Sequence, residues 1–187
     1  MVVALPTMSG HGENIFLIGP MGSGKTSIGR RVARRLGLDF HDCDLELENR
    51  TGVPVSLIFD IEGEKGFRTR ESALLRELAS GRGRLVSTGG GIILTAQNRE
   101  CMKENGLVVY LKTSVDQQLR RLERDRQRPL LQTSDRRERL EALARERNPV
   151  YESLADLIIV SENRSLRRMT RKVCRAIARV QEQHEAP

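Results

Sequence analysis

Short apolar runs alternate along the chain with longer segments in which apolar residues recur every three or four positions. Four runs rich in aliphatic and β-branched residues lie at 15–18, 85–87, 107–111 and 157–160, and a weaker one lies near 38–40. Short apolar runs separated by helical segments are typical of strands buried on both faces of a parallel sheet. The pattern therefore predicts an α/β fold with a five-stranded parallel sheet flanked by helices on both sides.

Two of the intervening segments have a clear helical period. The one after the first strand places Ile28, Val32 and Leu36 four residues apart, and the last one has an apolar stripe from Leu166 to Val180. Arginines occupy many of the other positions in both segments. Because one apolar stripe is enough to pack a helix on a sheet, we expect these arginines to face water.

The length of the chain indicates one domain. With 187 residues it can bury one sizeable core but not two, and we expect the domain at 14–180, with tails at 1–13 and 181–187. No apolar run approaches the ~18 residues of a membrane span, and the N-terminus lacks the pattern of a secretory signal. Three widely spaced cysteines suggest neither a disulfide framework nor a zinc site. These features predict a cytoplasmic protein with no membrane partner, and we expect a monomer.

The chain is basic, with a formal net charge of +7 that lies mostly in residues 112–187. Such a balance suits nucleic acid and small anionic molecules alike. Only six residues are aromatic and none is Trp, which leaves few surfaces on which single-stranded bases could stack. We therefore expect small anionic substrates and not nucleic acid, although a basic nucleic-acid-binding protein remains an alternative.

The strongest motif joins the first strand to the first helix. It reads Gly-Pro-Met-Gly-Ser-Gly-Lys-Thr over residues 19–26, which is a P-loop. Its glycines let consecutive backbone N–H groups face a phosphate chain, and the helix N-terminus adds a positive field. We expect Lys25 to reach the phosphates of ATP and Thr26 to ligate Mg²⁺. The predicted phosphate-binding residues are Gly22, Ser23, Gly24, Lys25, Thr26 and Ser27.

Two acidic residues, Asp42 and Asp44, follow the weak run at 38–40. We expect them to close the second strand at the carboxyl edge of the sheet, where ligands of parallel sheets bind. Alternate residues of a strand share a face, so both carboxylates could address the phosphates. The alternative is that Asp44 only caps a helix that begins at Leu45.

The segment at about 122–138 is densely charged and contains Pro129. Charged segments with a proline do not build a core, so we interpret this one as a mobile lid over the nucleotide. A solvated surface loop is the alternative that the composition leaves open.

Five further motifs accompany the P-loop in a fixed order along the chain. They are Phe40-x-Asp42-x-Asp44, Gly63-Glu-x-x-Phe67-Arg68-x-x-Glu71, Gly89-Gly-Gly91, Arg128-Pro-Leu-Leu and Arg147-x-Pro-x-Tyr151. Over about residues 14–170 the set resembles the shikimate kinase family. The resemblance implies a fold of the nucleoside monophosphate kinase type, with strand order 2-3-1-4-5. It also implies transfer of the γ-phosphoryl group of ATP to the 3-hydroxyl of shikimate, a step in aromatic amino-acid biosynthesis.

The resemblance implies roles for the residues around shikimate, which would bind in a helical region at about 44–72. Asp44 would hold the ring hydroxyls and face the attacking one, either as general base or as an aligning group. Arg68 and Arg147 would clamp the carboxylate, and Gly90 would approach the substrate through its backbone. The implied substrate-binding residues are Asp44, Arg68, Gly89, Gly90, Gly91 and Arg147.

On the nucleotide side, the resemblance implies that Arg128 closes over the phosphates and stabilises the transferring group. Arg121 and Arg164 would lie beside the adenine, where a guanidinium can stack. Thr26 would ligate Mg²⁺ directly and Asp42 through water, because no strand ends in a typical Walker B acid. The implied catalytic residues are Lys25, Asp44 and Arg128.

The nearest enzymatic alternative is another P-loop kinase of small metabolites, such as a gluconate kinase. It would share the P-loop, the lid and the architecture. It should lack Phe-Arg-x-x-Glu and Arg-x-Pro-x-Tyr, both of which this chain has at 67–71 and 147–151.

Overall fold

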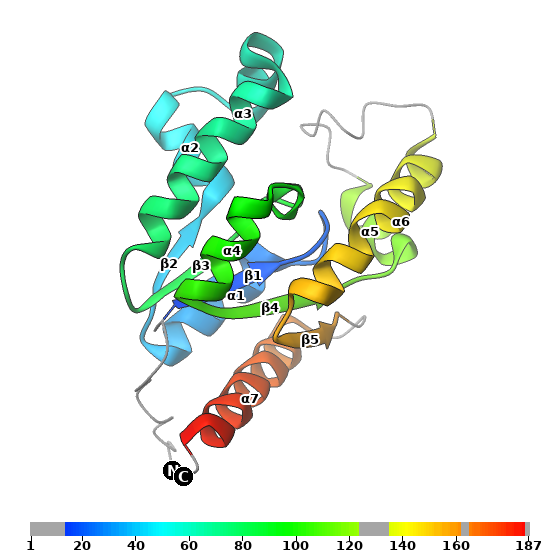
Figure 1. Ribbon diagram of the computed structural model, residues 1–187. Coiled ribbons are helices and arrows are strands. Elements are labelled where there is room, and N and C mark those ends of the chain that lie inside the picture. The colour runs from blue at the N-terminus through cyan, green and yellow to red at the C-terminus, as the bar shows by residue number, and fades with distance from the viewer. Residues whose placement is uncertain (1–13, 124–134, 162–164, 186–187) are drawn as a thin grey trace.

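The computed structural model describes residues 14–123, 135–161 and 165–185, and a parallel sheet forms its middle layer (Figure 1). The strand order is β2-β3-β1-β4-β5, and every neighbouring pair is parallel. The strands are β1 (Asn14–Ile18), β2 (Asp39–Asp42), β3 (Arg84–Ser87), β4 (Gly106–Lys112) and β5 (Leu157–Val160). The predicted fold class and strand order are confirmed.

Helices connect the strands on both sides of the sheet. They are α1 (Lys25–Leu36), α2 (Cys43–Thr51), α3 (Val55–Ala79), the short 3₁₀ turn η1 (Ile92–Leu94), α4 (Ala96–Asn105), α5 (Val115–Leu122), α6 (Arg136–Leu154) and α7 (Leu166–Glu185). The prediction of a tail from residue 181 is wrong up to Glu185, because α7 continues to that residue. The polar residues after Val180 extend the helix without needing an apolar stripe of their own.

The core lies in two layers, one on each face of the sheet. Side chains alternate along β1, so Phe16 and Ile18 pack under α3, α4 and α6, whereas Ile15 and Leu17 pack under α1 and α7 (Figure 1). All four are fully buried. A strand buried on both faces explains why β1 reads as a continuous apolar run rather than as an alternating pattern.

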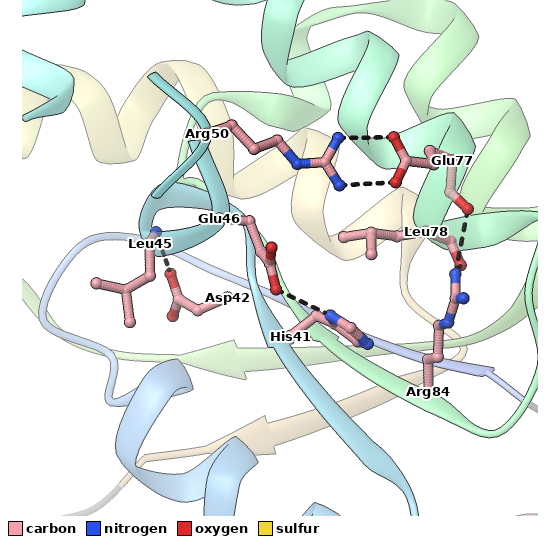
Figure 2. Close-up of polar contacts among 8 residues, drawn as sticks. All are labelled: His41, Asp42, Leu45, Glu46, Arg50, Glu77, Leu78 and Arg84. Atoms are coloured by element: carbon pink, nitrogen blue, oxygen red, sulfur yellow. Dashed lines mark hydrogen bonds and ion pairs between the residues drawn. The ribbon is translucent and has the colours of Figure 1, made fainter. Parts of the chain in front are cut away.

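Polar contacts fasten α2 and the end of α3 to the edge of the sheet (Figure 2). Arg50 of α2 donates to both carboxylate oxygens of Glu77 in α3, at 2.7 Å each. Arg84, the first residue of β3, donates to the carbonyl oxygens of Glu77 and Leu78 at 3.2 and 2.9 Å. These contacts join α2 to α3, and the end of α3 to β3.

The long helix α3 is interrupted at Gly63, whose φ of 69° and ψ of 179° are not helical. A side chain at this position would meet no atom within 4 Å, so the positive φ and not lack of space calls for glycine. The interruption makes Glu64 the start of a new helical segment, which carries the predicted substrate residue Arg68.

Most of the predicted lid, at about 122–138, lies outside the described residues. At its two ends the structure differs from the prediction, because Leu122 ends α5 and residues 136–138 form the first turn of α6. The side chain of Asp135 accepts the N–H of Glu138 at 2.9 Å and caps this turn. Among the described helices, none is long and apolar enough to cross a membrane.

Candidate active site

The P-loop links the buried end of β1 to the first turn of α1. Gly22 and Gly24 have φ values of 74° and 93°, in the left-handed region that favours glycine. The side chain of Lys25 turns back over the loop, where its Nζ donates to the carbonyl oxygens of Gly19 and Pro20 at 2.8 and 2.9 Å. The ammonium group therefore lies inside the curve of the loop, where a phosphate chain carries its negative charge.

The two residues predicted to serve a metal are in direct contact. Thr26 Oγ1 donates to Asp42 Oδ2 at 2.7 Å, which places a hydroxyl and a carboxylate side by side at the start of α1. Both are oxygen donors of the kind that Mg²⁺ prefers. The sequence-based pairing of Thr26 with Asp42 is therefore compatible with the geometry, and their role remains a prediction.

The arrangement of the two acidic residues differs from the sequence-based expectation. Asp42 ends β2 and caps α2, since its Oδ1 accepts the N–H of Leu45 at 3.4 Å (Figure 2). Asp44 lies in the first turn of α2 and not in β2. The expectation that both carboxylates share a strand face is wrong, and so is the alternative in which Asp44 is the cap. Asp44 reaches the site from a helix that Asp42 starts.

The residues predicted to bind the substrate that accepts the phosphoryl group form what we call the acceptor side of the site. It combines charged side chains of α2 and α3 with the glycine turn after β3, which is Gly89–Gly91. Arg68 Nη1 donates to Glu71 Oε2 at 2.6 Å, and the side chain of Glu71 is fully buried. A Cβ atom at Gly89 would lie 2.5 Å from Glu71 Oε1 and 3.3 Å from Asp44 Oδ1. A Cβ atom at Gly91 would overlap the Arg68 guanidinium. The turn thus packs directly against all three charged groups, and a side chain at Gly89 or Gly91 would displace Glu71 or Arg68 from its present position.

Glu71 is a site residue to which the sequence analysis assigned no role. Its Oε1 has no hydrogen-bond partner among the described residues. Burial raises the pKa of Glu71 to about 6, even though the neighbouring Arg68 acts to lower it. The signal that could have revealed it is the i, i+3 spacing from Arg68 on a helix, which brings the two side chains together.

Helix α6 contributes Arg147 and Tyr151, which are four residues apart. Arg147 is buried, and its Nε has no hydrogen-bond partner among the described residues. Its charge acts to lower the pKa of Glu71, which places it near the acceptor side of the site. The Tyr151 hydroxyl donates a short hydrogen bond to the carbonyl oxygen of Gly90. The predicted substrate residues from β3, α2, α3 and α6 therefore converge on one region.

Arg121 from α5 lies against the P-loop. Its Nη1 donates to the carbonyl oxygens of Gly22 and Ser23 at 2.9 and 3.3 Å, and to Ser161 Oγ at 3.1 Å. It therefore ties the loop to the end of β5, and its predicted place beside the adenine stays a prediction. Arg128 and Arg164 lie outside the described residues.

A P-loop at the carboxyl edge of a parallel sheet ordered 2-3-1-4-5, beside a cluster of acidic and guanidinium groups, defines a P-loop kinase. The family model described as shikimate kinase matches residues 21–178. This chain belongs to the shikimate kinase family, as its motifs predict.

The sequences of shikimate kinases match this chain over most of its length. A shikimate kinase of Thioalkalivibrio sulfidiphilus is 52% identical over 163 residues, covering 87% of this chain and 86% of the relative. One from Actinobacillus pleuropneumoniae serotype 5b is 47% identical over 169 residues, covering 90% and 98%.

A solved shikimate kinase structure matches this chain more closely than a solved gluconokinase structure does. A shikimate kinase from Acinetobacter baumannii in complex with shikimate is 44% identical, with a TM-score of 0.87 over 90% of this chain and 94% of that chain. A gluconokinase from Sinorhizobium meliloti is 18% identical, with a TM-score of 0.58 over 92% and 95%, and shares only the fold.

The buried carboxyl of Glu71 predicts a pH dependence of stability. Its pKa rises from 4.5 to about 6 on folding, so its stabilising contribution is complete below pH 4.5 and is lost as the pH rises through about 6. A shift of this size corresponds to about 2 kcal/mol. Urea unfolding at pH 4.5 and pH 7 should show wild type losing about this much free energy of unfolding relative to Glu71→Gln. If the free energies of unfolding of wild type and Glu71→Gln differed by the same amount at pH 4.5 and pH 7, this result would contradict the raised pKa of Glu71.

Proposed function

We propose that this protein transfers the γ-phosphoryl group of ATP to the 3-hydroxyl of shikimate, releasing ADP and shikimate 3-phosphate for aromatic amino-acid biosynthesis. The observation that carries the proposal is the convergence of the P-loop with Asp44, Arg68 and Arg147 at one edge of the sheet. Membership of the shikimate kinase family supports the same acceptor.

The acceptor side has the chemistry that shikimate requires. Shikimate carries one carboxylate and several ring hydroxyls, and two guanidinium groups, Arg68 and Arg147, can bind the carboxylate. In the structure Arg68 Nη2 donates to the exposed carboxylate of Glu64 at 3.2 Å, a contact that the substrate would replace. Glu71 holds Arg68 in place through a 2.6 Å hydrogen bond. Asp44, beside Gly89, is then the carboxylate that accepts hydrogen bonds from ring hydroxyls and orients the attacking one. We propose Gly89, Gly90 and Gly91 as the backbone wall of this pocket.

On the nucleotide side, we propose that Gly22, Ser23 and Gly24 bind the phosphates through their N–H groups, together with the first turn of α1. Lys25 neutralises charge on the β- and γ-phosphates as the phosphoryl group moves. The full proposed set on this side is Gly22, Ser23, Gly24, Lys25, Thr26, Ser27, Arg121, Arg128 and Arg164.

Thr26 and Asp42 fit a magnesium ion, since their adjacent hydroxyl and carboxylate oxygens lie next to the phosphate loop. When bound, Mg²⁺ would neutralise charge on the phosphate oxygens. Asp42 also caps α2, so the same carboxylate links this position to the helix that carries Asp44. We propose these two residues as the protein's contribution to the ion.

The expected setting is a cytoplasmic monomer with one domain that extends to the end of α7 at Glu185, and with a lid in the segment between α5 and α6. Cys43, Cys101 and Cys174 are free thiols, as is usual for proteins of a reducing compartment.

The deciding experiment measures ADP release by the purified protein with Mg²⁺ and ATP. Shikimate, gluconate, a nucleoside monophosphate or no acceptor is added in parallel. Turnover that depends on shikimate alone is the expected result. Equal background rates with every acceptor would overturn the proposal, and salt-dependent retention on DNA would then favour nucleic-acid binding.

The substrate clamp predicts a selective effect of Arg68→Lys. Lysine keeps the charge but loses the planar fork that can bind a carboxylate and Glu71 at once. We expect the KM for shikimate to rise at least about tenfold, with the KM for ATP changed less than about twofold.

The matched control is Arg70→Lys, two residues further along the same helix. Arg70 makes a bidentate ion pair with Glu62, at 2.7 and 2.6 Å, on the surface of α3. Its replacement should leave both KM values unchanged. Equal shikimate KM values for Arg68→Lys and wild type would remove Arg68 from the clamp.

A further inference from the structure

Tyr151 is fixed on two sides at the end of α6. It is 1% exposed, and its ring stacks on Tyr110 of β4 with centroids 5.0 Å apart and planes 21° apart. Its hydroxyl donates to the carbonyl oxygen of Gly90. Burial raises the pKa of Tyr151 above its usual value, so the hydroxyl keeps its proton and remains a donor. Sequence reasoning assigned this residue to a motif but gave it no task.

Gly90, whose carbonyl oxygen accepts this hydrogen bond, lies between the P-loop and the acceptor side of the site. A Cβ atom at Gly90 would be 3.6 Å from each of three atoms, namely Gly19 O and Met21 N of the P-loop and the Tyr151 hydroxyl oxygen. Gly90 is thus in contact distance of the phosphate loop on one side and of α6 on the other. Its two neighbours, Gly89 and Gly91, pack on the charged groups of the acceptor side.

Helix α6 brings a second group to the same place. Arg147 lies one helical turn before Tyr151, so both side chains leave the helix on the same side. A single hydrogen bond from Tyr151 therefore connects the helix that carries Arg147 to the turn that packs on Arg68 and touches the P-loop.

We propose that Tyr151 is a positioning residue, whose hydroxyl holds Gly90 between α6 and the P-loop and so sets the separation of the acceptor hydroxyl from the transferring phosphoryl group. This inference rests on the proposed function. Phosphoryl transfer depends chiefly on alignment, and a displacement of about 1 Å can lower a rate by about a hundredfold. A hydrogen bond that fixes the turn between the two substrates therefore acts on kcat, and through the packing of the turn on Arg68 also on the shikimate KM, without touching either substrate.

The test compares Tyr151→Phe with Tyr110→Phe, a matched control that the stacked pair provides. Tyr110 donates its own hydroxyl to Asn148 Oδ1 at 3.2 Å and does not bond to Gly90. Each change removes one buried hydroxyl and keeps the ring, so both variants should melt about 3 °C below wild type. Steady-state constants for shikimate and ATP are measured for all three proteins at 15 °C, after circular dichroism has confirmed folding.

For Tyr151→Phe we expect kcat about tenfold lower and the shikimate KM about fivefold higher, with the ATP KM within about twofold of wild type. For Tyr110→Phe we expect all constants within about twofold. Wild-type constants in Tyr151→Phe, or an equal loss in both variants, would overturn the inference. Absence of shikimate-dependent turnover in wild type would instead overturn the proposed function, so the two failures are distinct.

Discussion

Replacement of Asp44 by Asn is expected to lower kcat for shikimate phosphorylation by at least about a hundredfold, with ATP binding almost unchanged. The amide has the shape of the carboxylate but neither its charge nor its ability to accept a proton. Asp44 stands on the acceptor side, beside Gly89 and near the Arg68–Glu71 pair, and it is not part of the P-loop. The loss should therefore fall on the chemical step. Single-turnover kinetics with ATP and shikimate, together with equilibrium ATP binding, measure the two effects separately.

Glu46→Gln provides the control for this experiment. Glu46 lies in the same first turn of α2, and its carboxylate contacts His41 Nδ1 at 3.1 Å (Figure 2). The substitution removes the same charge from the same helix and should change kcat less than about twofold. An Asp44→Asn enzyme as active as Glu46→Gln would exclude Asp44 from the chemistry.

Lys25→Met is expected to lower kcat/KM by about a thousandfold, comparable with the loss of a group that stabilises transition-state charge. Methionine fills a similar volume but brings no charge to the β- and γ-phosphates. Without nucleotide, Lys25 Nζ also bonds to the carbonyl oxygens of Gly19 and Pro20. We therefore expect a lower melting temperature for the free protein, in addition to weaker ATP binding.

Lys103→Met is the control, because Lys103 is exposed in the last turn of α4. The kinetic constants and the nucleotide affinity should match those of wild type. Measurement of ATP affinity and single-turnover rate in both variants separates the binding effect from the chemical one. A Lys25→Met enzyme that keeps wild-type kcat/KM would contradict the assignment of the P-loop lysine.

The sequence by itself determined the sheet, the phosphate loop and the family. Strands buried on both faces are apolar throughout, so β1, β3 and β4 are visible without any tertiary information. The edge strand β5 is also a continuous apolar run, although Ile158 and Val160 are exposed. The P-loop is equally local, since its glycines, Lys25 and Thr26 occupy consecutive positions of one turn and one helix start. Such features depend on residues that are neighbours in the chain, and a sequence shows those neighbours directly.

Only the tertiary structure decided how the acceptor side is assembled. Whether Asp42 or Asp44 caps α2 depends on a boundary shift of one or two residues, which no propensity resolves. The burial of Glu71 depends on Gly89 and Arg68 packing over it, and the bond from Tyr151 to Gly90 joins residues 61 positions apart. Contacts between distant parts of a chain depend on how whole helices pack on the sheet. The motifs could therefore identify these residues, but they could not predict which of the residues contact one another.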